Sequence, residues 1–374
     1  MNFDLSEEQQ LVSDSIERFV QENYNLDSRI AIVKKSPGYS EEYWKTMSEL
    51  GWLGLPFSED DGGFGGDQID TMVLMEQFGK GLVLEPYLAS IILGGGAIKR
   101  AGNDEQRQAW LEGVIDGSKQ LALAYAEPES GDEPHNVALA GNKTGDGYTL
   151  TGTKCMVLHG GTATAFVVSF RTSGGTVDQS GITLALIPAD REGLSIQAFP
   201  TVDGLQSSEL TFDKVAVTAA DIIGDVDGGF ETLNATINDG ILAVAAEAVG
   251  AMEVLYKDTV AYTQDREQFD HPLADFQVLQ HRMVEMFMEY EQCKSLLFRA
   301  TMEVASNGED AQRCVHALKH LIGKASFFVG ENAVQTHGGM GVTEELRVGH
   351  YFKRLLVIEA QFGNTDYHLD QFAA

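Results

Sequence analysis

The chain has 374 residues, of which 43% are hydrophobic and 22% are charged, and its formal net charge at pH 7 is -30. This is the composition of an ordinary globular protein, and the length exceeds that of a single growing core, so two or three sub-domains are expected. The negative charge excludes sequence-independent binding to nucleic acid, because a polyanion would be repelled instead of releasing counterions.

The sequence shows no sign of a membrane segment, a secretory signal or a metal site. No uninterrupted apolar run approaches the roughly 18 residues of a membrane helix, and the opening residues lack a basic start followed by an apolar stretch. We therefore expect no membrane partner and a cytoplasmic location. Cys155, Cys293 and Cys314 are too few for a disulfide framework and have no paired metal-ligand spacing, so no metal is assigned.

Residues 1–117 are predicted to form a helical domain. Ser6 followed by Gln9 is a helix-start pattern, and apolar residues continue at helical spacing. Further helices are expected over residues 41–50, 68–78 and 105–115. The glycine-rich residues 60–66 are interpreted as a turn-rich loop, since no strand precedes them and no Lys-Ser/Thr pair follows.

Residues 118–225 are predicted to form a small β-domain. Short β-rich runs are separated by Gly, Asp and Ser turns, and they cover residues 148–150, 165–170, 181–187, 194–199 and 209–212. Glu127 precedes a proline that forbids further strand pairing, so we expect it where a strand leaves for a loop.

Residues 226–374 return to a helical pattern and are predicted to form a third domain. Apolar residues from Ile241 to Tyr256 fall on one stripe over four turns, which indicates core or interface, and Gly250 permits close helix contact. Further helices are expected over residues 276–304, 312–339 and 345–360. The helix, β, helix order predicts an α+β fold that is mostly α.

Five segments, in this order, resemble motifs of the acyl-CoA dehydrogenase family. They are Ala124–Asp132 (a Thr-Glu-Pro loop), Gly152-Thr153-Lys154 with Gly160-Gly161, Arg266–Phe269 (Arg-x-x-Phe), Gln335–Gly341 (Gln-x-x-Gly-Gly-x-Gly) and Phe362–Thr365 (Tyr-Glu-Gly-Thr). The resemblance spans essentially the whole chain. It implies an N-terminal helical domain, a middle β-domain, a C-terminal four-helix bundle and FAD as the cofactor. Among subtypes, the chain is most similar to the small subunit of pimeloyl-CoA dehydrogenase and to partner subunits of heterotetrameric steroid side-chain dehydrogenases, notably through residues 348–354.

The resemblance divides the FAD contacts into two sets. The set that reaches a neighbouring subunit's flavin is intact, and it consists of Arg266, Phe269, Gln335, Gly338 and Gly339, with the Thr365 hydroxyl near the same cofactor. A guanidinium can fork onto a pyrophosphate, and paired glycines allow close backbone approach. The set that holds the flavin ring within the subunit is altered, because Ala126, Met156 and Leu158 stand where the family places hydroxyl or aromatic side chains.

The expected catalytic base is absent. Gly363 occupies the position where the family most often has its glutamate, and glycine cannot abstract a proton. Some relatives carry the base at the position aligned with Gly240, next to Asp239. Asp239 is a weak candidate, because one residue out of register rotates it by about 100° around the helix.

Two basic features have more than one interpretation. His337 is read as a spacing residue or polar contact instead of an acid-base group. Lys353 and Arg354 are read as a solvated helix face or a subunit contact, with contact to a CoA phosphate as the alternative.

These residues predict a subunit of a heteromeric (α2β2) FAD-dependent acyl-CoA dehydrogenase that completes the FAD site of a homologous catalytic partner. The resemblance to these subtypes implies that the complex desaturates a dicarboxylyl or steroid-derived acyl-CoA and passes electrons to an electron-transfer flavoprotein. Two alternatives remain open: a self-sufficient homomeric dehydrogenase with a displaced base such as Asp239, and a flavin-free scaffold subunit.

Overall fold

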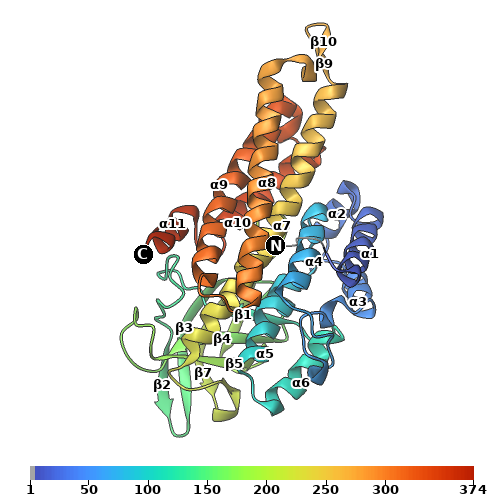
Figure 1. Ribbon diagram of the computed structural model, residues 1–374. Coiled ribbons are helices and arrows are strands. Elements are labelled where there is room, and N and C mark those ends of the chain that lie inside the picture. Colours follow the sequence, from blue (N-terminus) through green and yellow to red (C-terminus); the bar gives the residue numbers. More distant parts are fainter. Residues whose placement is uncertain (1–4) are drawn as a thin grey trace. The chain divides into compact units, whose positions relative to one another are not determined.

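The computed structural model describes residues 5–374 (Figure 1). Residue contacts divide the chain into two compact units. One combines the N-terminal residues up to Ala31 with Asp67–Val83 and Ile241–Ala374, and the other combines Ile32–Gly66 with Leu84–Gly240. The first is helical and the second contains the main sheet, so the predicted α+β class with predominant helix is confirmed.

The sheet of the second unit has eight strands. They are β1 (Leu121–Ala124), β2 (Ala140–Thr144), β3 (Gly147–Leu158), β4 (Ala165–Arg171), β5 (Ile182–Pro188), β6 (Leu194–Pro200), β7 (Gln206–Val217) and β8 (Ile222–Ile223). The spatial order is β6-β7-β3-β2-β4-β5-β8, and β1 pairs in parallel with β4. A cluster of buried apolar residues, including Phe166, Phe170 and Phe212, forms its core.

Strand β3 is irregular close to the motif residue Lys154. Its pairing with β7 shifts register between Leu150 and Gly152 and again between Lys154 and Val157. Met156 lies in the second irregularity with a φ of 51°, and its side chain is 53% exposed. A bulge of this kind redirects side chains away from the regular alternation of a strand.

The second unit also contains short helices. They are α3 (Glu41–Glu49), a π-helix (Leu88–Gly95), α5 (Gly96–Ala101) and α6 (Asp104–Ile115). The loop predicted at residues 60–66 is present. A Cβ at Gly63 would lie 2.4 Å from the Phe57 carbonyl oxygen, so glycine is required there by close backbone packing.

The first unit is built from long helices and one hairpin. They are α1 (Glu7–Asn23), α4 (Gln68–Gly81), most of α7 (Gly229–Asp265), β9 (Glu267–Gln268), β10 (His271–Pro272), α8 (Gln277–Ala305), α9 (Ala311–His337), α10 (Arg347–Ala360) and α11 (Thr365–Ala373). Helices α8, α10 and α11 pack against α9 (Figure 1). The predicted capping box of Ser6 and Gln9 opens α1.

Helix α7 corrects the prediction of a single apolar stripe. Every residue from Ile241 to Met252 is buried, so this part of the helix is covered on all sides. A Cβ at Gly250 would lie 1.9 Å from the Glu76 carbonyl oxygen of α4, and one at Gly79 would lie 2.0 Å from the Glu247 carbonyl oxygen. The two helices therefore touch backbone to backbone, as expected for Gly250.

Several elements were not predicted, namely α2 (Leu26–Val33), the π-helix, α5, α11, β2, β8, β9 and β10. Most are short, and β2 has exposed or half-exposed residues throughout, so its sequence carries no apolar alternation. In the part of the chain that the structure describes, no helix is long and apolar enough to cross a membrane.

Candidate functional site

The predicted cofactor contacts Arg266 and Phe269 lie at a projecting hairpin. Strands β9 and β10 connect α7 to α8, and Figure 1 shows them at the tip of these helices. Phe269 is 83% exposed and has a φ of 57°, and its ring lies edge-to-face to Phe276 with centroids 6.2 Å apart. Arg266 is exposed, and its guanidinium makes no hydrogen bond or ion pair with the described residues. A free guanidinium beside an exposed ring suits a ligand from outside this chain.

The same end of the helices brings the other predicted contacts close to the hairpin. Tyr262, one helical turn before Arg266, stacks on His337 with ring centroids 4.2 Å apart and an interplanar angle of 27°. The Tyr262 hydroxyl donates to the His337 carbonyl oxygen at 3.4 Å. Tyr262 therefore links the Arg-x-x-Phe segment to the segment that carries Gln335, Gly338 and Gly339.

His337 has a structural position in this contact. Its side chain is 5% exposed, and Nδ1 lies 2.8 Å from the Ala333 carbonyl oxygen. Because a carbonyl can only accept, Nδ1 carries a hydrogen and donates it. The geometry fits the predicted role as a polar and spacing contact at the end of α9.

Gly338 and Gly339 face open space. Gly338 ends α9 with φ 62° and ψ -141°, a conformation that favours glycine. A Cβ built on either glycine would meet no atom within 4 Å. Among residues 5–374 no side chain or backbone closes off the pair, so another molecule can approach the backbone closely.

A cavity of about 340 Å³ adjoins this segment. It is lined by Leu26, Asp258, Ala261, Tyr262, His337, Glu345, Leu346, Arg347 and Val348. The Arg347 guanidinium is engaged there, since Nε and Nη2 each lie 2.6 Å from an Asp258 carboxylate oxygen. Arg347 is therefore largely neutralised by its partner, in contrast to Arg266.

Gly363 is held in a conformation that excludes a longer side chain. It is buried, with a φ of 102°, and a Cβ would lie 2.5 Å from Tyr367 Cδ1 and 2.9 Å from His368 Nε2. Its carbonyl oxygen accepts from the buried Lys319 Nζ at 2.7 Å. The local backbone and packing thus oppose a glutamate, in addition to the sequence lacking one.

Thr365 is engaged within the chain. Its hydroxyl and its backbone N–H both donate to Glu359 Oε1, at 2.8 and 3.0 Å. A Cβ at Gly323 of α9 would lie 2.1 Å from the Thr365 hydroxyl oxygen, so Thr365 packs directly on that turn. Gly323 lies about 18 Å along α9 from Gln335. The structure therefore separates Thr365 from the hairpin and glycine contacts, which it groups together.

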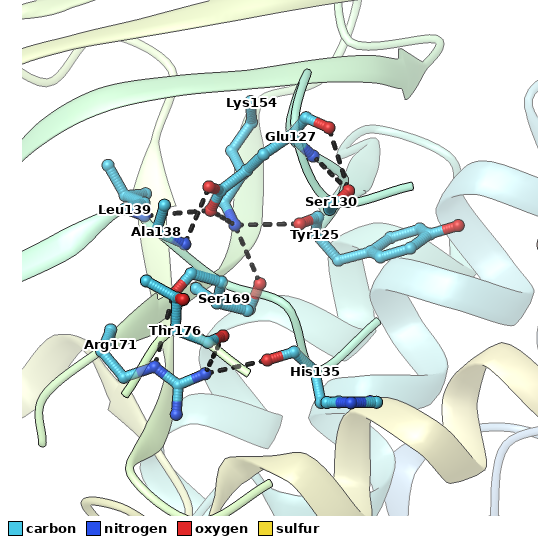
Figure 2. Close-up of polar contacts among 11 residues, drawn as sticks. Tyr125, Glu127, Ser130, His135, Ala138, Leu139, Lys154, Ser169, Arg171 and Thr176 are labelled. Carbon is cyan, nitrogen blue, oxygen red and sulfur yellow. Dashed lines mark hydrogen bonds and ion pairs between the residues drawn. The ribbon is translucent and has the colours of Figure 1, made fainter. Parts of the chain in front are cut away.

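The Glu-Pro and Gly-x-Lys motifs meet in a buried ion pair (Figure 2). Lys154 Nζ, with a fully buried side chain, lies 2.7 Å from Glu127 Oε1, and it also donates to the Tyr125 carbonyl and the Ser169 hydroxyl. Burial lowers the pKa of Lys154, and the Glu127 carboxylate opposes that shift. Sequence reasoning placed Glu127 correctly at the strand exit but missed its partner.

The pair fixes the loop that follows. Glu127 carboxylate oxygens accept from the backbone N–H groups of Ala138 and Leu139, at 2.9 and 3.1 Å. Arg171 holds the same region, because its guanidinium donates to five carbonyl oxygens, which are those of His135, Val137, Thr176, Asp178 and Ser180. Figure 2 shows the bonds to His135 and Thr176. The signal that could have revealed this network is Arg171, a charged residue at the end of the largely apolar strand β4.

The residues at the altered positions offer no side-chain hydroxyl. The Ala126 carbonyl accepts from the Cys155 N–H at 2.9 Å, which joins this loop to β3. Met156 is exposed at the bulge, and Leu158 is half-buried. Any polar contact from these three residues must therefore come from their backbones.

Asp239, the weak candidate base, forms an ion pair with Arg100 of α5. Its other carboxylate oxygen, Oδ1, is buried without a hydrogen-bond partner among the described residues. The pairing with Arg100 holds the Asp239 side chain in place on α7.

Arg354 corrects one interpretation. It is 3% exposed, and its Nε and Nη2 lie 2.6 and 2.7 Å from the two carboxylate oxygens of Glu247. It is therefore neither a solvated residue nor available to a CoA phosphate, because it is buried in a bidentate pair with Glu247. Lys353 is more accessible and pairs with Glu344 at 2.6 Å.

Comparisons with known proteins agree with the fold and motifs. Family models of the N-terminal, middle and C-terminal domains of acyl-CoA dehydrogenase match residues 6–118, 122–215 and 227–374. The chain belongs to the acyl-CoA dehydrogenase family. The probable acyl-CoA dehydrogenase YngJ of Bacillus subtilis is 27% identical over 371 residues, covering 98% of this chain and 97% of the relative.

Two solved structures are heteromeric by their descriptions. The ChsE4–ChsE5 complex of Mycobacterium tuberculosis is 25% identical, with a TM-score of 0.91, and the match covers 100% of this chain and 98% of that one. The Tcur3481–Tcur3483 steroid acyl-CoA dehydrogenase is 26% identical, with a TM-score of 0.88, covering 98% and 97%. Each is similar to this chain over nearly its full length.

Members of this family use FAD. The hairpin and glycine residues fit such a group, because Arg266 offers a guanidinium without a partner in the described chain and Gly338-Gly339 leave open space. A guanidinium can donate two parallel hydrogen bonds to phosphate oxygens, and glycine allows the backbone to approach the same oxygens closely. Arg266 and the two glycines therefore offer groups that can contact a phosphate.

Proposed function

We propose that this chain is the cofactor-completing subunit of a heteromeric, FAD-dependent acyl-CoA dehydrogenase. One observation carries the proposal. At Gly363, a φ of 102° and the contacts of a Cβ with Tyr367 and His368 oppose a glutamate at the usual position of the base. Meanwhile, Arg266 and Phe269 are exposed toward solvent on the hairpin. The chain offers contacts to a cofactor bound elsewhere and lacks the carboxylate for its own reaction.

The division of labour follows from these groups. A catalytic partner of the same family would supply the glutamate that abstracts the α-proton, together with the side chains that orient the flavin ring. This chain would bind the phosphate and adenosine part of that cofactor through Arg266, Phe269, Gln335, Gly338 and Gly339. The bound FAD would supply the acceptor for the β-hydride, and the product of the reaction would be a trans-2-enoyl-CoA. The electrons would then pass to an electron-transfer flavoprotein.

The assembly and the substrate are extensions of this proposal. Similarity to the ChsE4–ChsE5 complex and to a steroid acyl-CoA dehydrogenase of two components supports an α2β2 assembly acting on a bulky steroid-derived acyl-CoA, with a dicarboxylyl acyl-CoA as the other class. The CoA phosphates are anionic and this chain has a net charge of -30. The partner is therefore expected to supply the basic groups that bind CoA.

Flavin content tests the proposal. The chain is purified alone and after co-expression with a homologue that carries the Tyr-Glu-Gly-Thr segment, and the flavin absorbance per protein is measured. We expect flavin only in the complex. Flavin bound by the chain alone would support a homomeric dehydrogenase with a displaced base. Its absence from both samples would support a flavin-free scaffold, and either result would overturn the proposal.

The Arg266→Ala variant is expected to lower FAD affinity of the complex by roughly 10–100-fold, because loss of a charge-assisted hydrogen bond costs about 1.5–3 kcal/mol. The measurement is FAD retained after dialysis of the co-expressed complex, with circular dichroism to verify folding. Arg299→Ala is a matched control, since Arg299 is an exposed arginine on α8 whose nearest carboxylate lies 4.0 Å away. Equal FAD retention in both variants would show that Arg266 does not contact the cofactor.

A further inference from the structure

A chain of hydrogen bonds between side chains fastens α11 to α9. Gln312 Nε2 lies 2.8 Å from His316 Nε2, His316 Nδ1 lies 2.9 Å from His368 Nδ1, and His368 Nε2 lies 2.9 Å from the Phe362 carbonyl oxygen. His368 is on α11 and is 1% exposed, while His316 is half-buried on α9. In the described chain, no group of three or more His, Cys, Asp and Glu side chains is arranged to hold a metal ion.

The acceptors at the two ends fix where the hydrogens lie. The Phe362 carbonyl can only accept, so His368 Nε2 carries a hydrogen, and its Nδ1 is a bare acceptor in the neutral ring. The Gln312 amide nitrogen can only donate, so His316 Nε2 is a bare acceptor and its Nδ1 carries a hydrogen. The two assignments agree, because His316 Nδ1–H then donates to His368 Nδ1.

This arrangement is complete only when both rings are neutral. Protonation of His368 would place a second N–H on Nδ1, directly opposite the N–H of His316 at 2.9 Å. Protonation of His316 would place an N–H on Nε2, opposite the Gln312 amide. Protonation of His368 therefore removes a hydrogen bond, and either event adds a charge beside the neighbouring ring, which is unfavourable where access to water is limited.

We propose that the His316–His368 pair is a proton-sensitive latch that holds α11 and the Phe362–Thr365 segment on α9 near neutral pH and releases them in mild acid. The segment is the one that corresponds to the family's Tyr-Glu-Gly-Thr motif. The latch is a property of this chain and does not depend on which partner or cofactor it binds.

The charged groups around the pair also disfavour protonation of His316 and His368. Lys319 of α9 is buried beside the segment and donates to the carbonyls of Glu359 and Gly363, so it adds a fixed positive charge. On α10, the Glu359 carboxylate is occupied by Thr365. The acidic residues of α11, Asp366 and Asp370, are exposed to solvent. No carboxylate among these groups hydrogen-bonds either ring of the pair.

His320 provides an internal contrast. Its Nδ1 lies 3.0 Å from the Thr365 carbonyl oxygen, so it donates to an acceptor in both its neutral and its charged form. Protonation of His320 therefore keeps its hydrogen bond, whereas protonation of His368 breaks one. His316 and His320 lie one helical turn apart on α9.

The direction of the pH effect follows from these environments. Burial lowers the pKa of His368 to about 3, with Lys319 adding to the shift, and burial also lowers the pKa of His316. Once α11 opens, each ring regains an ordinary pKa near 6.5. The docked state therefore loses stability as pH falls below about 6.5. For one histidine, the opening equilibrium should increase roughly 30-fold at about pH 5.

Hydrogen–deuterium exchange of residues 362–373 tests the latch in the full chain. After correction for the intrinsic pH dependence of exchange, we expect opening of this segment to rise at least about 30-fold from about pH 7.5 to about pH 5. Peptides from α8 serve as the internal reference. An unchanged opening equilibrium in the wild-type chain would overturn the proposal.

Three substitutions locate the effect. In His316→Gln, the amide can turn to present either N–H or C=O to His368, so the pH response should fall, while burial and Lys319 still disfavour the charged His368 ring. His320→Gln should keep the full response. His368→Gln should also suppress it, and it tests the same pair if His316→Gln does not fold. A full response in His316→Gln and His368→Gln, or its loss in His320→Gln, would show that the pair is not the latch.

Discussion

The isolated chain is expected to turn over acyl-CoA substrates about 10²–10⁴-fold more slowly than a family member that carries its base, and Gly363→Glu is not expected to recover this rate. The slower turnover of the isolated chain is the usual loss of rate when a general base is removed. The second expectation rests on the backbone at Gly363. A side chain there must adopt a φ of 102° and displace Tyr367 and His368, which costs about 1 kcal/mol or more.

A correctly placed carboxylate would still lack an oriented cofactor. Proton abstraction is accelerated only when the reacting atoms are held at about 3–3.5 Å in suitable alignment. Ala126 and Leu158 provide no side-chain hydrogen bond toward a flavin ring. The added glutamate would therefore have no held substrate and cofactor on which to act.

Two measurements test these expectations. One is dye reduction by the isolated chain, and the other is single-turnover flavin bleaching of the complex. Gly363→Ala is the matched control, because it introduces the same backbone strain without a carboxylate. A doubling of reducible FAD per complex in Gly363→Glu, but not in Gly363→Ala, would show that this chain holds a complete site. If the wild-type chain alone is active, loss of that activity in Asp239→Asn would identify Asp239 as the displaced base.

The Lys154→Met variant is expected to lower the free energy of unfolding by about 3–5 kcal/mol, because it leaves the Glu127 carboxylate buried without its counter-charge. Both side chains are almost completely buried, at 0% and 7% exposure. Replacing both charges is expected to cost less than the sum of the single changes, since a neutral Glu127→Gln/Lys154→Met pair buries no uncompensated ion.

Urea unfolding of the two single variants and the double variant gives the coupling free energy directly. Lys143→Met is a suitable control, because Lys143 is an exposed lysine on the neighbouring strand β2. Additive effects of the two single substitutions would contradict the ion pair as a coupled unit. The loop 127–139 should also become accessible to protease in Lys154→Met, because Glu127 would lose the contact that orients it toward Ala138 and Leu139.

Local sequence signals were sufficient for the regular elements. The Ser6–Gln9 capping box, the helix from Glu41 and the strand from Ala165 were all predicted because each depends on residues close in the chain. Helix α11 was not predicted, although Asn364 caps it, because it is only nine residues long and several of its residues are exposed. Short elements of this kind are defined by their packing.

The sequence by itself determined the fold class, the family motifs and the absence of a glutamate at position 363, because these depend on residue type and order. Only the tertiary structure decided which residues are engaged and which are available. It pairs Glu127 with Lys154 and Arg354 with Glu247, and leaves Arg266 exposed without a partner in the described chain. The physical reason is that the same charged side chain binds a ligand or stabilises a core according to its neighbours in space, and these neighbours lie 27 to 107 residues away in the chain.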